Sequence, residues 1–217
     1  MKRKLIASTV FACFLAACGS SKEASNSNFE KAIDKHFAKQ CITVTPAAVS
    51  ADGNKYPIAV GLETKASWQQ QVQVDEHNAQ RTQYFDALVD AGDLSVSNGT
   101  KQVKSWLGNR ESTVPAKIYS LTDAGKKTLA SPDGLAFCVG HYKVDDITRF
   151  SEPSNALGHT ISEVAFTASP VDVPDWTKND KVAKAFNLDQ ALAGHIKANR
   201  TMVLASDGWI DSADFSN

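Results

Sequence analysis

Apolar residues recur with a helical period in three parts of the chain. These parts are residues 28–40, 66–91 and 180–193. In the first, Phe29, Ile33 and Phe37 are spaced at i, i+4 and i+8, so one face of the helix should be buried. In the second, the apolar stripe starts at Trp68 and Val72, and this stretch is the longest helix that the sequence predicts. A short fourth helix is expected over 123–129.

Alternation of apolar and polar residues predicts strands, most clearly in the C-terminal half. The strand-like segments are 58–60, 94–121, 135–150, 158–171 and 200–210, with tight turns expected at 98–99, 108–109 and 207–208. Two of them, 135–150 and 158–171, should pair as antiparallel strands with one buried face. We therefore predict an α+β fold, with a helical half (29–130) packed with a C-terminal antiparallel sheet and its helix (131–217).

Two phrases frame the strand-like segment 94–121. L-V-D-A-G-D-L at 88–94 precedes it, and Y-S-L-T-D-A-G at 119–125 ends it. The pair resembles the frame of the wing in winged-helix proteins, in which a β-hairpin lies between two helices. This resemblance covers 66–130 and implies a winged-helix-like N-terminal half. The family's DNA-binding role is not carried over, because the helix before the hairpin holds four acids that would repel phosphates: Asp75, Glu76, Asp86 and Asp90.

The start of the chain has the parts of an export signal. Three positive charges at 2–4 precede an apolar stretch over 5–17, which is shorter than the roughly 20 residues of a membrane span. The following Leu15-Ala-Ala-Cys18 resembles the bacterial lipobox, in which the signal is removed and the cysteine thiol is acylated. The resemblance implies a lipoprotein (signal 1–17, flexible tether 18–28) that is held on the cell envelope by lipid, palmitate included, on Cys18. An ordinary signal peptide, with Cys18 incidental, is the alternative.

The residue after the lipidated cysteine bears on localisation. Gly19 stands there rather than an aspartate. This resembles lipoproteins that are passed on to the outer membrane, where the domain would face the periplasm.

The remaining cysteines fit an oxidising compartment. Cys41 and Cys138 are left once the signal is removed and Cys18 carries lipid, and the two favour a disulfide. Such a bond would close a loop of nearly a hundred residues and stabilise the fold by about 4–5 kcal/mol on a chain-entropy estimate. Two buried free thiols are the alternative.

Charge and motifs narrow the functions. Removing 1–17 takes the net charge from −1 to −4, which gives no basic footprint for nucleic acid. The sequence has no phosphate loop, dinucleotide fingerprint or zinc-protease motif, so we expect no cofactor and no metal site. His141, Asp145 and Asp146 are the best local acid–base group, because alternate residues of a strand share a face. Trp176 could line a groove, with core packing, the commoner use of an aromatic side chain, as the favoured alternative.

Three hypotheses of function follow. The leading one is a non-enzymatic lipoprotein domain, attached to a membrane by lipid, that binds an envelope protein or a small molecule. The alternative is a cell-envelope hydrolase with a site assembled from distant residues. An exported DNA-binding module comes third, and the absence of a basic patch in the sequence opposes it.

Overall fold

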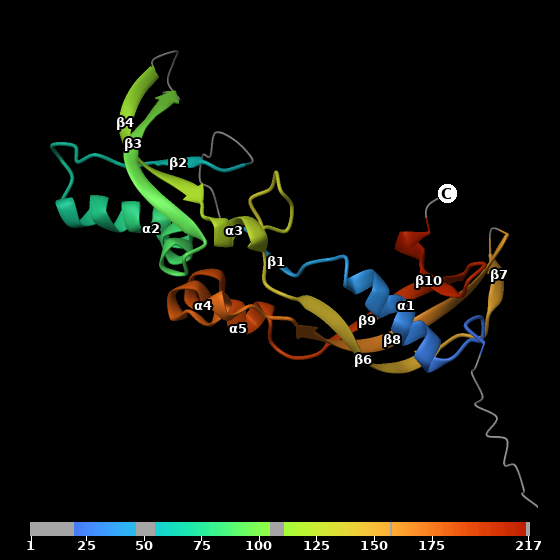
Figure 1. The fold of residues 1–217 in the computed structure, drawn as a ribbon. Helices are drawn as coiled ribbons and strands as arrows, with labels where there is room; N and C mark the ends of the chain where they lie inside the picture. Colours follow the sequence, from blue (N-terminus) through green and yellow to red (C-terminus); the bar gives the residue numbers. More distant parts are fainter. Residues whose placement is uncertain (1–19, 47–54, 105–110, 157, 216–217) are drawn as a thin grey trace, which may run out of the picture.

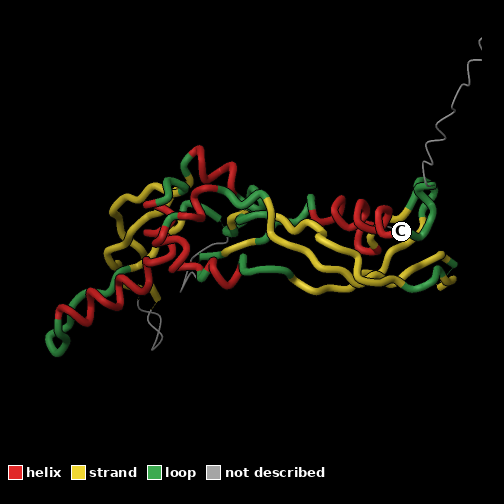
Figure 2. Tube along the Cα trace, turned by 90° about the horizontal axis from the view of Figure 1, so that it is seen from below, coloured by secondary structure: helices red, strands yellow, loops and turns green. Residues whose placement is uncertain are grey.

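The protein is elongated and consists of two lobes. The computed structural model describes residues 20–46, 55–104, 111–156 and 158–215 (Figure 1). Both views show the two lobes side by side along one axis, linked by extended chain (Figures 1 and 2). We call 20–40, 141–172 and 195–215 the sheet lobe, and 55–135 with 173–194 the helical lobe. Helices and strands occur in both, so the expected α+β class is confirmed.

The sheet lobe is a helix on an antiparallel sheet. The sheet has the strand order β10-β9-β8-β6, and the short strand β7 pairs with β8 outside this path. The elements are α1 (Asn26–Phe37), β6 (His141–Phe150), β7 (Ser154–Ala156), β8 (His159–Val171), β9 (Ile196–Leu204) and β10 (Trp209–Asp211). The expected pairing of the two C-terminal strands and the final hairpin are therefore both confirmed.

The core of this lobe lies under α1. The predicted stripe Phe29, Ile33 and Phe37 is buried, with exposed fractions of 0, 0 and 5%. The Phe29 ring packs edge-on against Phe150 and Trp209, with centroids 5.0 and 4.9 Å away. The helix that covers this sheet is thus α1, and not the C-terminal helix that the sequence analysis placed there. α1 offers three large apolar side chains on one face, and these fill the space above the sheet.

The helical lobe is built around a three-stranded sheet of order β2-β4-β3. Its elements are β2 (Ile58–Gly61), α2 (Gln71–Asp90), β3 (Leu94–Lys104), β4 (Glu111–Leu121), α3 (Asp123–Thr128), η1 (Asp175–Lys178), α4 (Asp180–Phe186) and α5 (Leu188–Ala191). Val182 of α4 and Leu188 of α5 share a core with Phe85 and Leu88 of α2. The expected C-terminal helix is divided at Asn187, whose φ is 50°.

The two cores do not follow the expected boundary at residue 130. The N-terminal helix α1 belongs to the core of the sheet lobe, while α4 and α5 of the C-terminal half belong to the core of the helical lobe. The chain therefore passes between the lobes several times. At the junction, β1 (Thr43–Val44) pairs with β5 (Phe137–Cys138). Sequence position did not separate the units because each lobe needs apolar faces from both halves of the chain.

Several local predictions are confirmed and two are wrong. Gly92 ends α2 with φ at 85°, and the Thr122 side chain caps α3 by accepting a bond from Gly125 N. The expected turn at 98–99 is wrong, because β3 runs through it. A Cβ atom on Gly99 would lie 2.4 Å from Ile118 Cδ1, so this glycine makes room for a cross-strand side chain.

The second error concerns the start of α2. The helix begins at Gln71, and its buried face contains Val74, Phe85 and Leu88. Trp68 and Val72, which the sequence analysis placed in the apolar stripe, are 81% and 54% exposed. Within the described part of the chain, no helix is long and apolar enough to cross a membrane.

Candidate functional site

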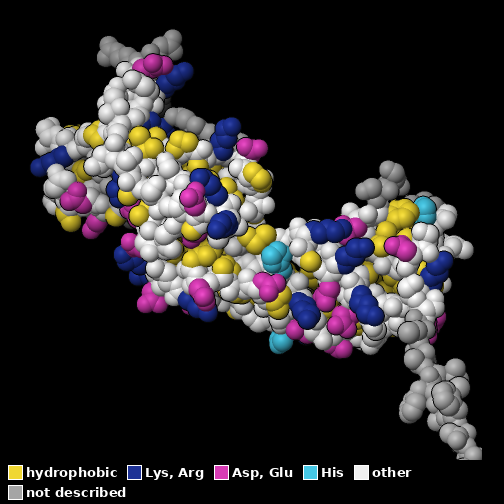
Figure 3. Space-filling view, in the orientation of Figure 1, with side chains coloured by type: hydrophobic (Ala, Val, Ile, Leu, Met, Phe, Trp, Pro, Cys, Tyr) yellow, Lys and Arg dark blue, Asp and Glu magenta, His cyan; other side chains and the backbone are white. Residues whose placement is uncertain are grey.

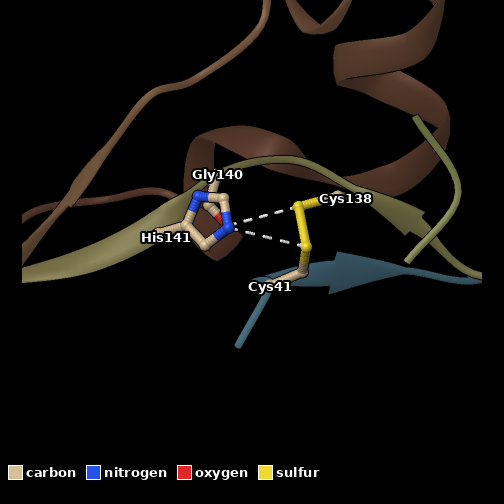
Figure 4. Close-up of a disulfide and its surroundings, with 4 residues drawn as sticks. All are labelled: Cys41, Cys138, Gly140 and His141. Atoms are coloured by element: carbon tan, nitrogen blue, oxygen red, sulfur yellow. Dashed lines mark hydrogen bonds between the residues drawn. A yellow bond between two sulfur atoms is a disulfide. The ribbon is translucent and has the colours of Figure 1, made fainter. Parts of the chain in front are cut away.

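The disulfide at the junction between the lobes is the centre of the candidate site. Cys41 and Cys138 are bonded, as the sequence analysis expected, and their Cα atoms are 5.2 Å apart. Cys138 ends β5 and Cys41 lies two residues before β1, so the bond joins two paired strands (Figure 4). The pairing continues past the strands, because Ile42 N donates to Gly140 O and Val139 N donates to Ile42 O, both at 2.8 Å.

His141 lies directly beside this disulfide. Its Nε2 is 3.8 Å from Cys41 Sγ, and Figure 4 shows the ring turned toward the sulfur atoms. Its Nδ1 is buried and has no hydrogen-bond partner within the described residues. A disulfide sulfur is at best a weak acceptor, so neither ring nitrogen of His141 has a strong partner. Buried polar groups of this kind are rare in folded proteins and call for an explanation.

A cavity opens on one side of His141. Its volume is about 280 Å³, and its wall includes residues of α1, β6 and the end of β8. The lining residues are Asp34, Ala38, His141, Tyr142, Lys143, Val171 and Asp172. His141 is thus part of the wall of this cavity, whereas Cys41 and Cys138 are not.

The acid–base group that the sequence analysis favoured is not assembled. His141 is turned toward the Cys41–Cys138 disulfide, and among the described residues no hydrogen bond or ion pair joins it to Asp145 or Asp146. Asp145 instead contacts His195, with Oδ2 at 2.7 Å from Nδ1. Ser169 is the third member, and its hydroxyl lies 2.9 Å from Asp145 Oδ2 and 2.8 Å from His195 Nδ1.

This Ser169–His195–Asp145 group does not have the geometry of a catalytic triad. In a triad, the serine and the carboxylate contact different ring nitrogens, so the imidazole can take the serine proton while the acid orients it. Here both contact Nδ1, and the serine proton is directed to the carboxylate. The hydrogen bond from His195 is the main cause that lowers the pKa of Asp145. Sequence reasoning missed the group because its members are far apart in the chain. Asp145 lies in β6, Ser169 lies in β8 and His195 directly precedes β9.

A second exposed feature is the loop before α2, which presents Trp68. Glu63 holds this loop, since its backbone N–H donates to Asn78 Oδ1 at 2.7 Å and its carbonyl accepts from Asn78 Nδ2 at 3.0 Å. Its carboxylate accepts from Gln69 and lies 3.1 Å from His77 Nδ1. These hydrogen bonds, first that from Gln69 and then that from His77, lower the pKa of the Glu63 carboxyl. These bonds tie the loop to α2, while the indole of Trp68 is exposed to solvent.

Trp176, which the sequence analysis considered as a residue that could line a groove, is packed against other side chains. It is partly buried against the core of the helical lobe, and its ring lies edge-on to Phe137 at 6.1 Å. Its indole Nε1 is buried and has no partner within the described residues. Cys18 lies outside the described residues.

Charged side chains of both signs are interspersed over the face of the molecule in Figure 3. This face has no large area of a single charge that would attract a polyanion. No protein family model, curated protein or solved structure matches this chain.

Proposed function

We propose that this protein is a lipid-anchored lipoprotein of the bacterial envelope, attached through Cys18 and facing the periplasm, that acts by binding another envelope protein. The observation that carries the proposal is that the start of the described chain and the exposed Trp68 loop lie at opposite ends of the molecule. The described chain begins at one end, two residues after Cys18, and the exposed Trp68 loop lies at the other end (Figures 1 and 2).

The first described residues, which the sequence analysis placed in a flexible tether, are instead fastened to the sheet lobe. The indole Nε1 of Trp209 donates to the carbonyls of Lys22 and Glu23, at 3.2 and 3.1 Å. Asn28 Nδ2 donates to the carbonyls of Ser20 and Glu23, both at 2.9 Å. An anchor on Cys18 would therefore hold the end of the sheet lobe close to the membrane and direct the helical lobe away from it.

The far end carries the features of a contact surface. Trp68 and Val72 are the two most exposed large apolar side chains of the described residues, and the loop bonds described above fix the backbone around the indole. A rigid, exposed tryptophan loses little entropy on binding, which is why tryptophans dominate many interfaces. Asp75 and Glu76 are exposed on the next turn of α2. The partner that fits is a protein with an apolar pocket bordered by basic residues.

The shape of the helical lobe supports a finer proposal, that it is winged-helix-like. A helix (α2) is followed at Gly92 by the β3–β4 hairpin, and β2 completes the sheet on the other side of β4. We do not extend this to DNA binding, because the exposed acids of α2 oppose contact with phosphates.

Labelling tests the anchor. Cells that express the wild-type chain and the Cys18→Ala variant are grown with radioactive palmitate, and the protein is isolated from each. We expect label in the wild type and none in the variant, with the unprocessed signal retained. Equal labelling of the two proteins would exclude the anchor.

Photo-crosslinking in intact cells tests the contact surface. A photoreactive amino acid is placed at Val72, with Asn199 on the sheet lobe as the control position, and the products are identified by mass spectrometry. We expect one crosslinked protein from position 72, lost when Trp68→Ala is added, and none of it from position 199. The same products from both positions would count against the proposed surface.

A further inference from the structure

The partly buried imidazole of His141 at the junction faces two cysteine sulfurs, and its Nδ1 has no hydrogen-bond partner among the described residues. We propose that Cys41, Cys138 and His141 form a Zn²⁺-binding site when the disulfide is reduced, and that the disulfide closes this site under oxidising conditions. Thiolate sulfur and imidazole nitrogen are the ligands that zinc prefers in proteins.

The distances between the three groups suit this coordination. The two sulfurs and His141 Nε2 all lie within 4.8 Å of one another, and Nε2 is 3.8 Å from Cys41 Sγ. In a tetrahedral zinc site, with Zn–S near ~2.3 Å and Zn–N near ~2.0 Å, neighbouring ligand atoms are roughly 3.5–3.8 Å apart. The imidazole is already at this spacing from one sulfur. The sulfurs themselves must move apart to this spacing once their bond is broken, which a rotation of the cysteine side chains would allow.

The backbone holds the cysteines in place without the disulfide. Ile42 exchanges backbone hydrogen bonds with Gly140 and Val139, and the β1–β5 pairs extend this ladder on the other side. Phe137, next to Cys138, is fully buried in the core of the helical lobe. Reduction therefore leaves two thiols that are still adjacent, and a preorganised site binds a metal with less loss of entropy.

The imidazole gains a partner when the metal binds. With the disulfide closed, Nε2 faces only a weakly accepting sulfur. In the metal-bound state, its lone pair would coordinate zinc, and the ring proton would be on Nδ1. Zinc would thus give Nε2 a strong partner, while the buried Nδ1–H would still have none among the described residues.

The reaction balances with a dithiol as reductant. Two electrons and two protons pass from an envelope dithiol to the Cys41–Cys138 bond, giving two thiols here and a disulfide in the reductant. Zinc binding then releases both thiol protons, because the ligands are thiolates. An oxidising dithiol–disulfide partner reverses the sequence and expels the metal.

Three protein ligands leave one zinc position open. Sites of this kind hold water or a substrate in the fourth position. The 280 Å³ cavity that His141 helps to line has two carboxylates in its wall, Asp34 and Asp172, against the single ammonium group of Lys143, and this charge favours a cation nearby.

Metal titration of the reduced protein tests the proposal. The sample is residues 18–217 with Cys18→Ser, so that Cys41 and Cys138 are its only thiols. It is reduced with a phosphine and titrated with Co²⁺ and then Zn²⁺, and the charge-transfer absorption of the Co²⁺–thiolate bond is recorded. His141→Ala is the test variant. His195→Ala is the matched control, because it removes an exposed imidazole of the same lobe, 68% exposed, that contacts Asp145.

We expect one equivalent of metal with thiolate charge-transfer absorption in the reduced wild type and in His195→Ala. The oxidised protein should show no such band, and His141→Ala should bind at least about tenfold more weakly. Circular dichroism follows the fold of each sample. Three results would overturn the proposal: no metal bound by the reduced protein, equal affinity in His141→Ala and wild type, or loss of the fold on reduction.

Discussion

The Asp86 carboxylate of α2 links the helix to the sheet of the helical lobe. Its replacement by Asn tests how much this link contributes to the stability of the fold. Its oxygens accept from Tyr119 Oη and Thr82 Oγ1, both at 2.7 Å, and from Lys117 Nζ at 2.8 Å. Tyr119 is fully buried, so its hydroxyl depends on this acceptor. Asp86→Asn keeps the volume of the side chain and removes the charge. It also places an amide N–H₂, which can only donate, beside the three groups that donate to the carboxylate.

The expected cost follows from these contacts. A hydrogen bond to a charged group contributes about 1.5–3 kcal/mol, but the remaining amide oxygen still accepts some of these bonds. The carboxylate is also 39% exposed, so solvent screens its pairing with Lys117. We therefore expect the free energy of unfolding at pH 7 to fall by about 2 kcal/mol.

The loss should depend on pH. Burial by itself raises the pKa of Asp86, but the bonds from Lys117, Thr82 and Tyr119 outweigh it, so the pKa in the folded state is below that of a free aspartate. The stabilisation by the carboxylate is then complete above about pH 4 and is lost as the pH falls through the folded pKa. Asn does not titrate, so the difference between wild type and Asp86→Asn should shrink at low pH.

Urea unfolding followed by circular dichroism, at pH 7 and at pH 3, measures this difference. The control is Asp123→Asn, which removes a carboxylate that is 92% exposed and should change the stability little. A loss below about 0.5 kcal/mol at pH 7, or an equal loss at both pH values, would refute the reasoning.

Three further substitutions test the rest of the fold. Phe29→Ala removes the ring that packs against Trp209 under α1, and urea unfolding should show a loss of about 4 kcal/mol. A loss below about 1 kcal/mol would mean that α1 does not form this core. Gly125→Ala places a Cβ atom 2.0 Å from the backbone oxygen of Asp93, so it should destabilise by about 3 kcal/mol in the same assay. A neutral effect would contradict this close approach. Trp209→Phe removes the indole donor to the Lys22 carbonyl, which should cost about 1 kcal/mol locally and speed trypsin cleavage after Lys22 about fivefold. Unchanged cleavage would show that the indole does not fasten the start of the chain.

The elements themselves could largely be read from the sequence, because they depend on neighbours a few residues apart. The stripe Phe29, Ile33 and Phe37 predicted α1, and alternation predicted β6 and β8. Gly92 and Thr122 mark helix ends through their own backbone freedom or side-chain oxygen. The bonded pair Cys41 and Cys138 followed from counting the cysteines of a chain that we expected to be exported.

The local patterns were misleading where a partner from elsewhere in the chain decides the outcome. Gly99 has the sequence of a turn, yet its role is to accommodate Ile118 of the paired strand. Trp68 fits the apolar period of the helix that follows it, yet the bonds of Glu63 hold its loop outside that helix. In both cases a contact between separate elements outweighs a propensity of a fraction of a kcal/mol per residue.

The sequence by itself determined most of the helices and strands, since these depend on short-range spacing. Only the tertiary structure decided which helix covers which sheet, because burial depends on the shape and area of both faces and not on their order along the chain. It also decided the site. His141 meets Cys41, a hundred residues earlier in the chain, because β1 and β5 pair at the junction, and His195 meets Asp145 because β6, β8 and β9 lie side by side.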